Sequence, residues 1–258
     1  MEKIGINMLA YKGIDDSEYI KAIAGNGFTA TFSGVFDAER QLKIANDCLK
    51  NGVEYENLHA PFSHINDIWY EGENGDRMLD ELLDCVYKCE LVGIKTAVIH
   101  LSSGEYAPPL TEIGKERFFR LVDFAKNKNV KLAFENQRKF YNLKWALKTF
   151  SKDDGVGFCW DCGHENCFTP GQEFMPIFGN RIICTHIHDN NGVYNDDSHL
   201  LPFDGNIDFK KVIYRLEKAN FSGSLMLEVT AANEKYDKIS FEEYLRRAFI
   251  SAKKLTKI

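Results

Sequence analysis

Apolar runs of strand length alternate with segments of helical periodicity along the whole chain. The strand-like runs cover residues 3–9, 28–34, 54–62, 95–104, 131–137, 156–164, 181–190 and 223–230. The helix-like segments that follow them cover residues 15–27, 37–52, 76–93, 111–129, 142–154, 171–179, 207–221 and 240–255. Alternating units of this kind build a parallel sheet. Eight of them with no Pro/Gly-rich linker predict a single (β/α)8 TIM barrel domain over residues 1–258.

A doubly wound open sheet is the alternative arrangement of the same units. Such sheets commonly bind nucleotides, but neither a G-x-G-x-x-G motif nor a P-loop follows the first strand-like run. The barrel is therefore the preferred fold. In its first helix we expect Asp15 or Asp16 to be the N-cap and Gly27 to mark the end.

Polar residues of one chemical kind stand at the ends of the strand-like runs. In a TIM barrel these carboxyl ends meet at one mouth, where active sites lie. In the third to the eighth runs, the apolar stretch is followed by a histidine or a carboxylate near the carboxyl end of the run. These residues are His59, His100, Glu135, Asp161, His186 and Glu228. Histidines and carboxylates converging in one mouth are the ligands expected for a divalent metal such as zinc or manganese. The pattern therefore predicts a metal site.

More candidate ligands stand just beyond these strand ends. His164 lies three residues after Asp161, and Asp197 and His199 lie in the long loop after the seventh run. His188 shares a strand face with His186. We expect His188 either to contact substrate or to orient a metal ligand, since both suit a histidine that points into the mouth.

Composition narrows the function without identifying it. The formal net charge of −6 disfavours a long footprint on nucleic acid, which usually shows as a basic face. The sequence holds no apolar run of about 18 residues and no signal-peptide pattern at its start, so a cytoplasmic protein without a membrane span is expected. Seven cysteines without framework spacing are expected to be reduced thiols, with Cys85 and Cys89 buried in a helix.

Cys159 and Cys162, in the segment FCWDCGHEN, have the C-x-x-C spacing of redox and zinc motifs. On a strand, three residues span about 10 Å, beyond the ~7 Å limit between the Cα atoms of a disulfide. The two side chains would also point to opposite faces, and the second C-x-x-C pair of a zinc knuckle is missing. We therefore expect Asp161 and His164 to carry the chemistry of this segment, with Cys159 facing inward.

Seven segments together resemble the xylose-isomerase-like TIM-barrel superfamily, which groups sugar isomerases and epimerases, inosose dehydratases and endonuclease IV. They are LHAPF, VIHLSSG, LAFEN, WDCGH, THIHD, DDSHLLPFDGNIDF and LEVT, and they extend over nearly the whole chain. The resemblance implies one divalent ion bound by Glu135, Asp161, His186 and Glu228. The further resemblance to endonuclease IV implies up to three zinc ions, with additional ligands from His59, His100, His164, Asp197 and His199.

The first functional hypothesis is a divalent-metal-dependent isomerase or epimerase of a sugar or sugar phosphate. In such an enzyme the metal stabilises the charge that develops on an enediolate oxygen. Glu135 and Glu228 would then remove a proton from the carbon beside the carbonyl and return it. His188 and Arg138 are the candidate substrate contacts, with Arg138 able to meet a phosphate.

Three alternatives stay open: an endonuclease-IV-like zinc phosphodiesterase, an inosose-dehydratase-like lyase, and a sugar-binding barrel without turnover. The phosphodiesterase fits the full ligand set. The loop SHINDIWYEGENGD after the third strand opposes it, because four acidic residues and no Lys or Arg would repel a nucleic acid backbone. A small carbohydrate is therefore the expected partner, with Trp69, Tyr70 and the loop around Tyr194 as candidate lids. Barrels of this kind are often dimers or tetramers, so a homo-oligomer is one expectation.

Overall fold

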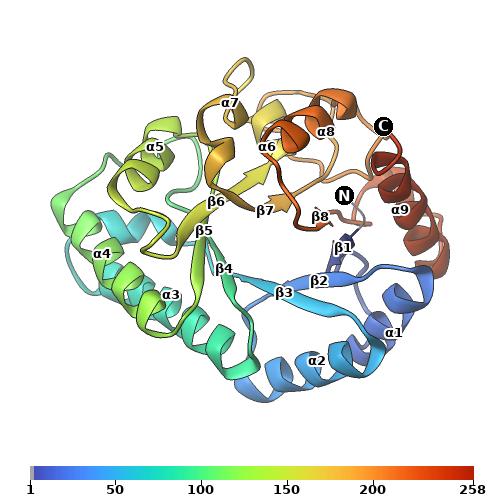
Figure 1. The fold of residues 1–258 in the computed structure, drawn as a ribbon, viewed down its shortest axis with the longest axis horizontal. Helices are drawn as coiled ribbons and strands as arrows, with labels where there is room; N and C mark the ends of the chain where they lie inside the picture. The colour runs from blue at the N-terminus through green and yellow to red at the C-terminus, as the bar shows by residue number, and fades with distance from the viewer. Residues whose placement is uncertain (1–2) are drawn as a thin grey trace.

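Parallel strands form the centre of the molecule in the computed structural model, which describes residues 3–258. The sheet order is β7-β6-β5-β4-β3-β2-β1-β8, so the strands follow one another around the sheet in chain order and β8 returns to β1. Figure 1 shows the strands surrounded by helices, with the two ends of the chain on the same side. The strands are β1 (Ile4–Asn7), β2 (Ala30–Gly34), β3 (Glu54–His59), β4 (Thr96–Ile99), β5 (Lys131–Glu135), β6 (Val156–Asp161), β7 (Ile182–His186) and β8 (Leu225–Leu227). The prediction of a TIM barrel is confirmed.

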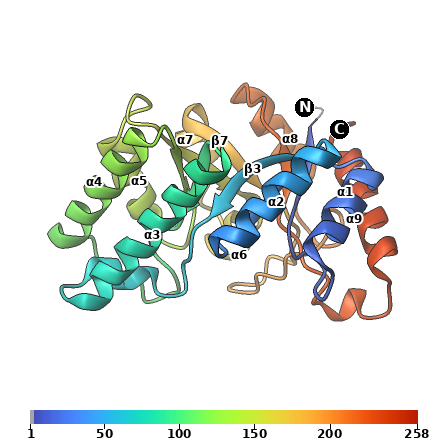
Figure 2. The same cartoon turned by 90° about the horizontal axis from the view of Figure 1, so that it is seen from below.

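The helices lie on the outside of the sheet, as the side view in Figure 2 also shows. The α-helices are α1 (Asp16–Asn26), α2 (Ala38–Asn51), α3 (Glu73–Val92), α4 (Glu112–Asn127), α5 (Phe140–Thr149), α6 (Cys162–Cys167), α7 (Met175–Phe178), α8 (Phe209–Lys218) and α9 (Phe241–Leu255). Short 3-10 segments are η1 (Ile65–Trp69), η2 (Gly179–Arg181) and η3 (Glu234–Tyr236). Asp15 caps α1 by accepting from the Ser17 amide, and Gly27 ends it with a left-handed φ of 100°. Both terminal residues were predicted.

The segment after β6 departs most from prediction. A helix was expected at residues 171–179, but the structure has α6 directly after the strand and only the short α7 within that range. Asp161 explains the early start, because its Oδ1 accepts from the His164 amide at 2.6 Å and so caps α6. Pro176 stands at the start of α7, where a proline is tolerated.

The barrel closes between β7 and β8 with fewer ladder bonds than elsewhere. One parallel bridge joins Ile187 to Leu227. Below it, the Thr185 hydroxyl donates to the Ser224 carbonyl at 2.8 Å and accepts from the Met226 amide at 3.3 Å. A side chain therefore takes the place of backbone pairing at this seam.

The inside of the barrel is filled by small side chains, by one methionine and by Phe32, whose ring stacks on His186. Val98, Ala133, Cys159 and Cys184 form one buried group. Met226 occupies the space beside Gly5, where a Cβ would lie only 2.4 Å from the Met226 sulfur. The larger core, between strands and helices, takes most of the Leu, Ile and Phe side chains. The histidines and carboxylates of the strand ends lie beyond this packing, at the mouth of the barrel.

All seven cysteines are buried and free of disulfides, as predicted. Cys85 and Cys89 are buried residues of α3. Cys159 faces the barrel interior and Cys162 begins α6, where its thiol donates to the His188 carbonyl. The C-x-x-C spacing therefore brings the two thiols to different surroundings.

The prediction that Trp69 acts as a lid is wrong. Its side chain is fully buried, its Nε1 donates to the Leu101 carbonyl at 2.7 Å, and its ring packs against Phe118. Tyr70 and Tyr194 are half exposed, and the Tyr194 hydroxyl donates to Oε1 of Glu105 at 3.4 Å. Within residues 3–258, no helix is long and apolar enough to cross a membrane.

Candidate metal centre

Six strand-end side chains converge at the carboxyl end of the barrel. His59, Glu135, Asp161 and His186 are the last residues of β3, β5, β6 and β7, while His100 and Glu228 directly follow β4 and β8. Four of them form what we call the strand-end cluster: Glu135, Asp161, His186 and Glu228. One potential ligand atom from each lies within 4.8 Å of those of the others.

His186 lies between the two glutamates of the strand-end cluster. Its Nδ1 is 3.0 Å from Oε1 of Glu135 and 3.3 Å from Oε2 of Glu228. Burial alone would raise the pKa of Glu135, but the charge of His186 and the hydrogen bond from His100 bring it well below its usual value. Burial likewise opposes the charged form of Glu228, and His186 nevertheless lowers its pKa. Both glutamates are therefore ionised at neutral pH.

Glu135 uses its second oxygen for the two histidines of β3 and β4. Oε2 lies 3.2 Å from Nε2 of His59 and 2.7 Å from Nε2 of His100. Burial lowers the pKa of His100 despite the nearby carboxylate, so this histidine favours its neutral, ligating form. Glu135 thus presents one oxygen to the strand-end cluster and the other to His59 and His100, which is the placement of a bridging carboxylate.

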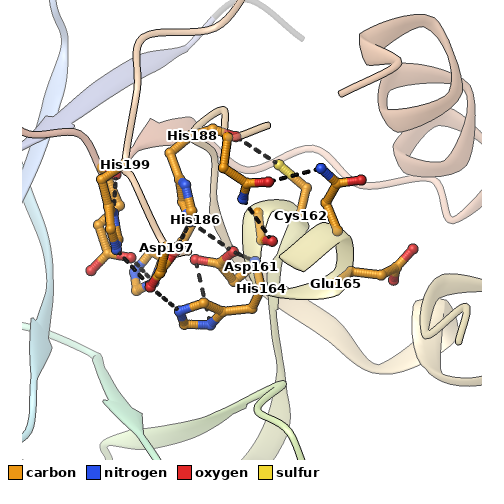
Figure 3. Close-up of polar contacts among 12 residues, drawn as sticks. Asp161, Cys162, His164, Glu165, His186, His188, Asp197 and His199 are labelled. Atoms are coloured by element: carbon orange, nitrogen blue, oxygen red, sulfur yellow. Dashed lines mark hydrogen bonds and ion pairs between the residues drawn. The ribbon is translucent and has the colours of Figure 1, made fainter. Parts of the chain in front are cut away.

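A second group, the loop cluster, consists of His164, His188, Asp197 and His199, with one potential ligand atom from each within 4.8 Å of the others. Figure 3 shows these side chains turned toward one another. Oδ2 of Asp197 accepts from Nε2 of His164 at 3.2 Å and from Nε2 of His199 at 3.1 Å. The rings of His188 and His199 stack with centroids 4.0 Å apart.

Asp197 controls the charge of its two histidines. Burial alone would lower the pKa of His164, but Asp161 and the hydrogen bond to Asp197 raise it to about 10. Burial opposes protonation of His199 as well, and the bond to Asp197 raises its pKa to about 9. The same two bonds outweigh burial at Asp197 and hold its pKa far below the usual value. Without an ion, the loop cluster is a network of charged pairs.

The loop that carries Asp197 and His199 depends on Asp189, which the sequence pattern did not single out. The buried carboxylate of Asp189 accepts backbone bonds from Asn190, Phe203, Gly205 and Ile207 at 2.9 to 3.1 Å. A Cβ at Gly205 would lie 2.3 Å from the Asn190 carbonyl oxygen. The aspartate of THIHD and the glycine of the following loop are therefore needed to fold this segment.

Asn136 and Gln137, directly after Glu135, were also missed. The Asn136 side chain exchanges two hydrogen bonds of 2.8 Å with the backbone of Asp161. Gln137 places its amide 3.2 Å from Nε2 of His100 and 3.0 Å from Nδ1 of His164. Their position after a strand-end carboxylate was the only signal, because their partners lie on other strands.

The side chains of the strand-end cluster fit a divalent cation. Buried polar atoms normally have hydrogen-bond partners. Two atoms of this cluster lack one within residues 3–258: Oδ2 of Asp161 and Nε2 of His186. Carboxylate oxygens and imidazole nitrogens at this spacing are the donors that zinc and manganese accept. The loop cluster offers the same donor types, and Gly163 makes room for it, since a Cβ there would meet the His188 ring at 1.9 Å.

A cavity of about 130 Å³ opens over both clusters. Its lining includes most of the predicted site residues outside the barrel strands, as well as Arg138 and the aromatic rings of Phe62 and Phe168. A neighbouring hollow beside β1 to β3 shares His59, Phe62 and Glu228 with it. Glu135 and His186 are buried and line neither opening, but they contact the lining residues His100 and Glu228.

Residues 18–248 match the family model described as xylose isomerase-like TIM barrel. The chain is 35% identical over 139 residues to an uncharacterized protein of Sinorhizobium fredii, which covers 53% of this chain and 42% of that protein. It is 26% identical over 190 residues to an uncharacterized protein of Methanocaldococcus jannaschii, covering 66% and 63%. The matched part is thus less than two thirds of the length of either curated relative.

Solved structures share the fold over nearly their whole length. D-psicose 3-epimerase from Clostridium cellulolyticum H10, crystallised with D-tagatose, has a TM-score of 0.82 at 12% identity, with 99% of both chains covered. The IolI protein with a bound zinc atom has a TM-score of 0.77 at 19% identity, covering 98% of this chain and 96% of that one. At these identities the likeness concerns the fold alone. Because the family model spans most of the sequence, the chain belongs to the xylose isomerase-like TIM barrel family.

Proposed function

We propose that the protein is a divalent-metal-dependent isomerase or epimerase of a small carbohydrate. The observation that carries this proposal is the strand-end cluster, in which two glutamates, an aspartate and a histidine from four strands bring ligand atoms within 4.8 Å of one another. These four residues would hold the ion, which is expected to be zinc or manganese. A bound divalent ion supplies Lewis-acid stabilisation of charge on the oxygens of the substrate.

Glu135 and Glu228 are the proposed acid–base pair. Both are ionised at neutral pH, because His186 and the other nearby histidines lower their pKa values against the effect of burial. One carboxylate removes the proton from the carbon beside the carbonyl, which leaves an enediolate. In an epimerisation the other carboxylate takes up a proton from solvent and returns it to the opposite face, and the first carboxylate gives the abstracted proton up to solvent. Their places on β5 and after β8, on either side of His186, suit such a division.

The surroundings favour a small polar substrate. The cavity of about 130 Å³ adjoins a hollow of about 380 Å³, and imidazoles, carboxylates and Arg138 contribute to its lining. His188 lies beside this lining, with its Nε2 3.1 Å from Oδ1 of Asp161. We propose that it orients Asp161 and the substrate hydroxyls. The names of structural neighbours, such as a D-psicose 3-epimerase crystallised with D-fructose, support a ketose as substrate.

The second candidate is a multi-zinc phosphodiesterase, and the loop cluster favours it. With His59 and His100 around Glu135, three sets of ligands are present. The acidic loop between β3 and α3 opposes it, because DNA binding requires cationic side chains along the phosphate backbone. An inosose-dehydratase-like lyase is the third candidate, since the same proton abstraction can start the loss of water.

Two measurements test the proposal. Metal analysis of the purified protein should find one zinc or manganese ion per chain in the strand-end cluster, whereas three zinc ions would support phosphodiester chemistry. Incubation of a panel of ketoses in deuterated water should place deuterium on the carbon beside the carbonyl, as NMR would detect. Glu135→Gln and Glu228→Gln should each abolish this exchange, and exchange that survives either substitution contradicts the two-base mechanism. Cleavage of abasic DNA, or dehydrated product, would replace the proposal by one of the alternatives.

A further inference from the structure

Arg138 lines the cavity and has no acidic partner among the described residues. Within residues 3–258, no carboxylate is within ion-pair distance of its guanidinium, whereas Arg40, Arg117 and Arg215 are each paired with an acidic side chain. Arg138 is also the one Lys or Arg of the described chain that lines either opening at the mouth. The cavity therefore contains a cation whose counter-ion does not come from the chain.

Two contacts hold the guanidinium of Arg138 in a fixed orientation. Its Cζ lies 3.4 Å from the centroid of the Phe168 ring, and Phe168 itself stacks on His164. Its Nε donates to Oδ1 of Asn195 at 2.7 Å. These contacts use one face and the Nε edge of the group, and the two terminal amino groups make no hydrogen bond with residues 3–258. Such a fork suits the paired oxygens of a phosphate or carboxylate.

The acidic residues of the cavity do not compete for Arg138. Asp197 accepts from His164 and His199, and Glu228 lies against His186. The chain as a whole carries a formal charge of −6, so its overall field would not attract an anion. Any anion that binds at this mouth must therefore be held by a local cation, and Arg138 is placed to do so.

We propose, resting on the function proposed above, that Arg138 binds an anionic group of the substrate. The substrate would then be a phosphorylated or carboxylated sugar and not a neutral ketose. Arg138 follows Glu135 by three residues, so the anion would lie beside the proposed acid–base pair. Binding of a part of the substrate that does not react can hold its reacting carbon in place. A contact of this kind selects one class of sugar from others with the same ketose group.

The rival explanation is that Arg138 only supports the loop around Asn195. Arg138→Gln tests both, with Arg120→Gln as the matched control, because Arg120 is an exposed arginine of α4 without an ion pair. The first measurement is calorimetric titration of chelator-treated protein with inorganic phosphate and, separately, with acetate. We expect phosphate to bind saturably to the wild type and Arg120→Gln, and about tenfold or more weakly to Arg138→Gln. Equal binding to all three proteins would overturn the inference.

The second measurement is kcat/KM for a ketohexose, its 6-phosphate and the corresponding keto-uronate. Arg138→Gln should lower the value for one anionic compound by about tenfold or more while changing the neutral ketose by less than about twofold. The compound that loses most distinguishes phosphate from carboxylate, and Arg138→Lys should restore part of the loss. An equal loss on all three compounds would assign Arg138 to loop support and overturn the inference.

Turnover of the neutral ketose alone, with no phosphate binding, removes this inference but leaves the proposed function. Phosphate binding through Arg138 without turnover of any ketose would support this inference and contradict the proposed function.

Discussion

The strand-end cluster and the loop cluster are neighbours in the mouth, but different parts of the fold hold them. Glu135, Asp161 and His186 are strand residues whose backbones are fixed by ladder bonds to adjacent strands. Asp197 and His199 belong to a loop without regular structure, and His199 has a left-handed φ of 44°. The two clusters touch where Nε2 of His188 lies 3.1 Å from Oδ1 of Asp161.

This difference indicates that the two clusters can fail separately. The strand-end cluster depends on the barrel, so it should persist as long as the protein is folded. The loop cluster depends on the bonds from the 190–207 segment to Asp189, and loops open locally at a lower free energy than strands. The same mouth therefore combines a rigid ligand set with one that can be loosened on its own.

Glu135→Gln is expected to have the largest effect. It removes the carboxylate that contacts His186, His59 and His100, so we expect kcat/KM to fall by about 10³-fold. Metal analysis should show loss of the strand-end ion. Glu54→Gln is the control, since Glu54 begins β3 at the opposite end of the barrel, where it pairs with Lys3. An equal loss of activity in the control would trace the effect to the barrel and not to the site.

Asp189→Asn should separate the two clusters. The new amide puts a donor where backbone amides need an acceptor, which should cost about 2 kcal/mol of unfolding free energy. Hydrogen exchange should show faster opening of residues 190–207, while the strand-end cluster keeps its ion. Asp196→Asn in the same loop is the control, because Asp196 accepts only from the Ser198 hydroxyl. Parallel loss of both clusters would contradict their independence.

The loop cluster should also make stability depend on pH in the chelator-treated protein. The pKa values of His164 and His199 are raised to about 10 and about 9 in the folded state, against about 6.5 in the unfolded chain. Folding therefore favours their protonated forms. That stabilisation is complete below pH ~6.5 and is lost as pH rises through the folded values.

Urea unfolding between pH 6 and 9.5 would measure this loss. Asp197→Asn removes the carboxylate that binds both histidines, so its unfolding free energy should change less over the same range. His186, whose pKa is also raised, should contribute equally to both proteins and cancel in the difference. Identical pH profiles for the two proteins would rule out charged pairs in the loop cluster.

Cys162→Ala should have the smallest effect. Cys162 begins α6 between the two clusters, and its thiol makes a single weak bond to the His188 carbonyl. We expect a loss of about 1 kcal/mol in unfolding free energy, from the smaller side chain, and kcat/KM within about twofold of the wild type. A large loss of activity at unchanged stability would point to thiol chemistry that the C-x-x-C spacing suggests and the structure does not support.

The strand-end residues could be predicted from sequence because each one ends an apolar run. Asp161 shows the limit of that approach, because its second use as the cap of α6 was not expected. The structural role of Asp189 could not be predicted from sequence, since its partners are backbone amides of a loop that has no periodic pattern of apolar residues. Trp69 was misplaced for a related reason: its partners Phe118 and Trp145 come from helices far along the chain. Side chains with distant partners require the fold before their place can be known.

The seam between β7 and β8 has a mechanical consequence. There the Thr185 hydroxyl stands in for part of the backbone pairing, and a single bridge follows above it. His186 and Glu228 stand on the two edges of this seam, with 3.3 Å between Nδ1 and Oε2. An ion bound by both residues would cross-link β7 and β8, where the barrel has the fewest ladder bonds. The ion would then contribute both to the chemistry of the mouth and to the closure of the barrel. Removal of the metal should therefore first increase the mobility of β8.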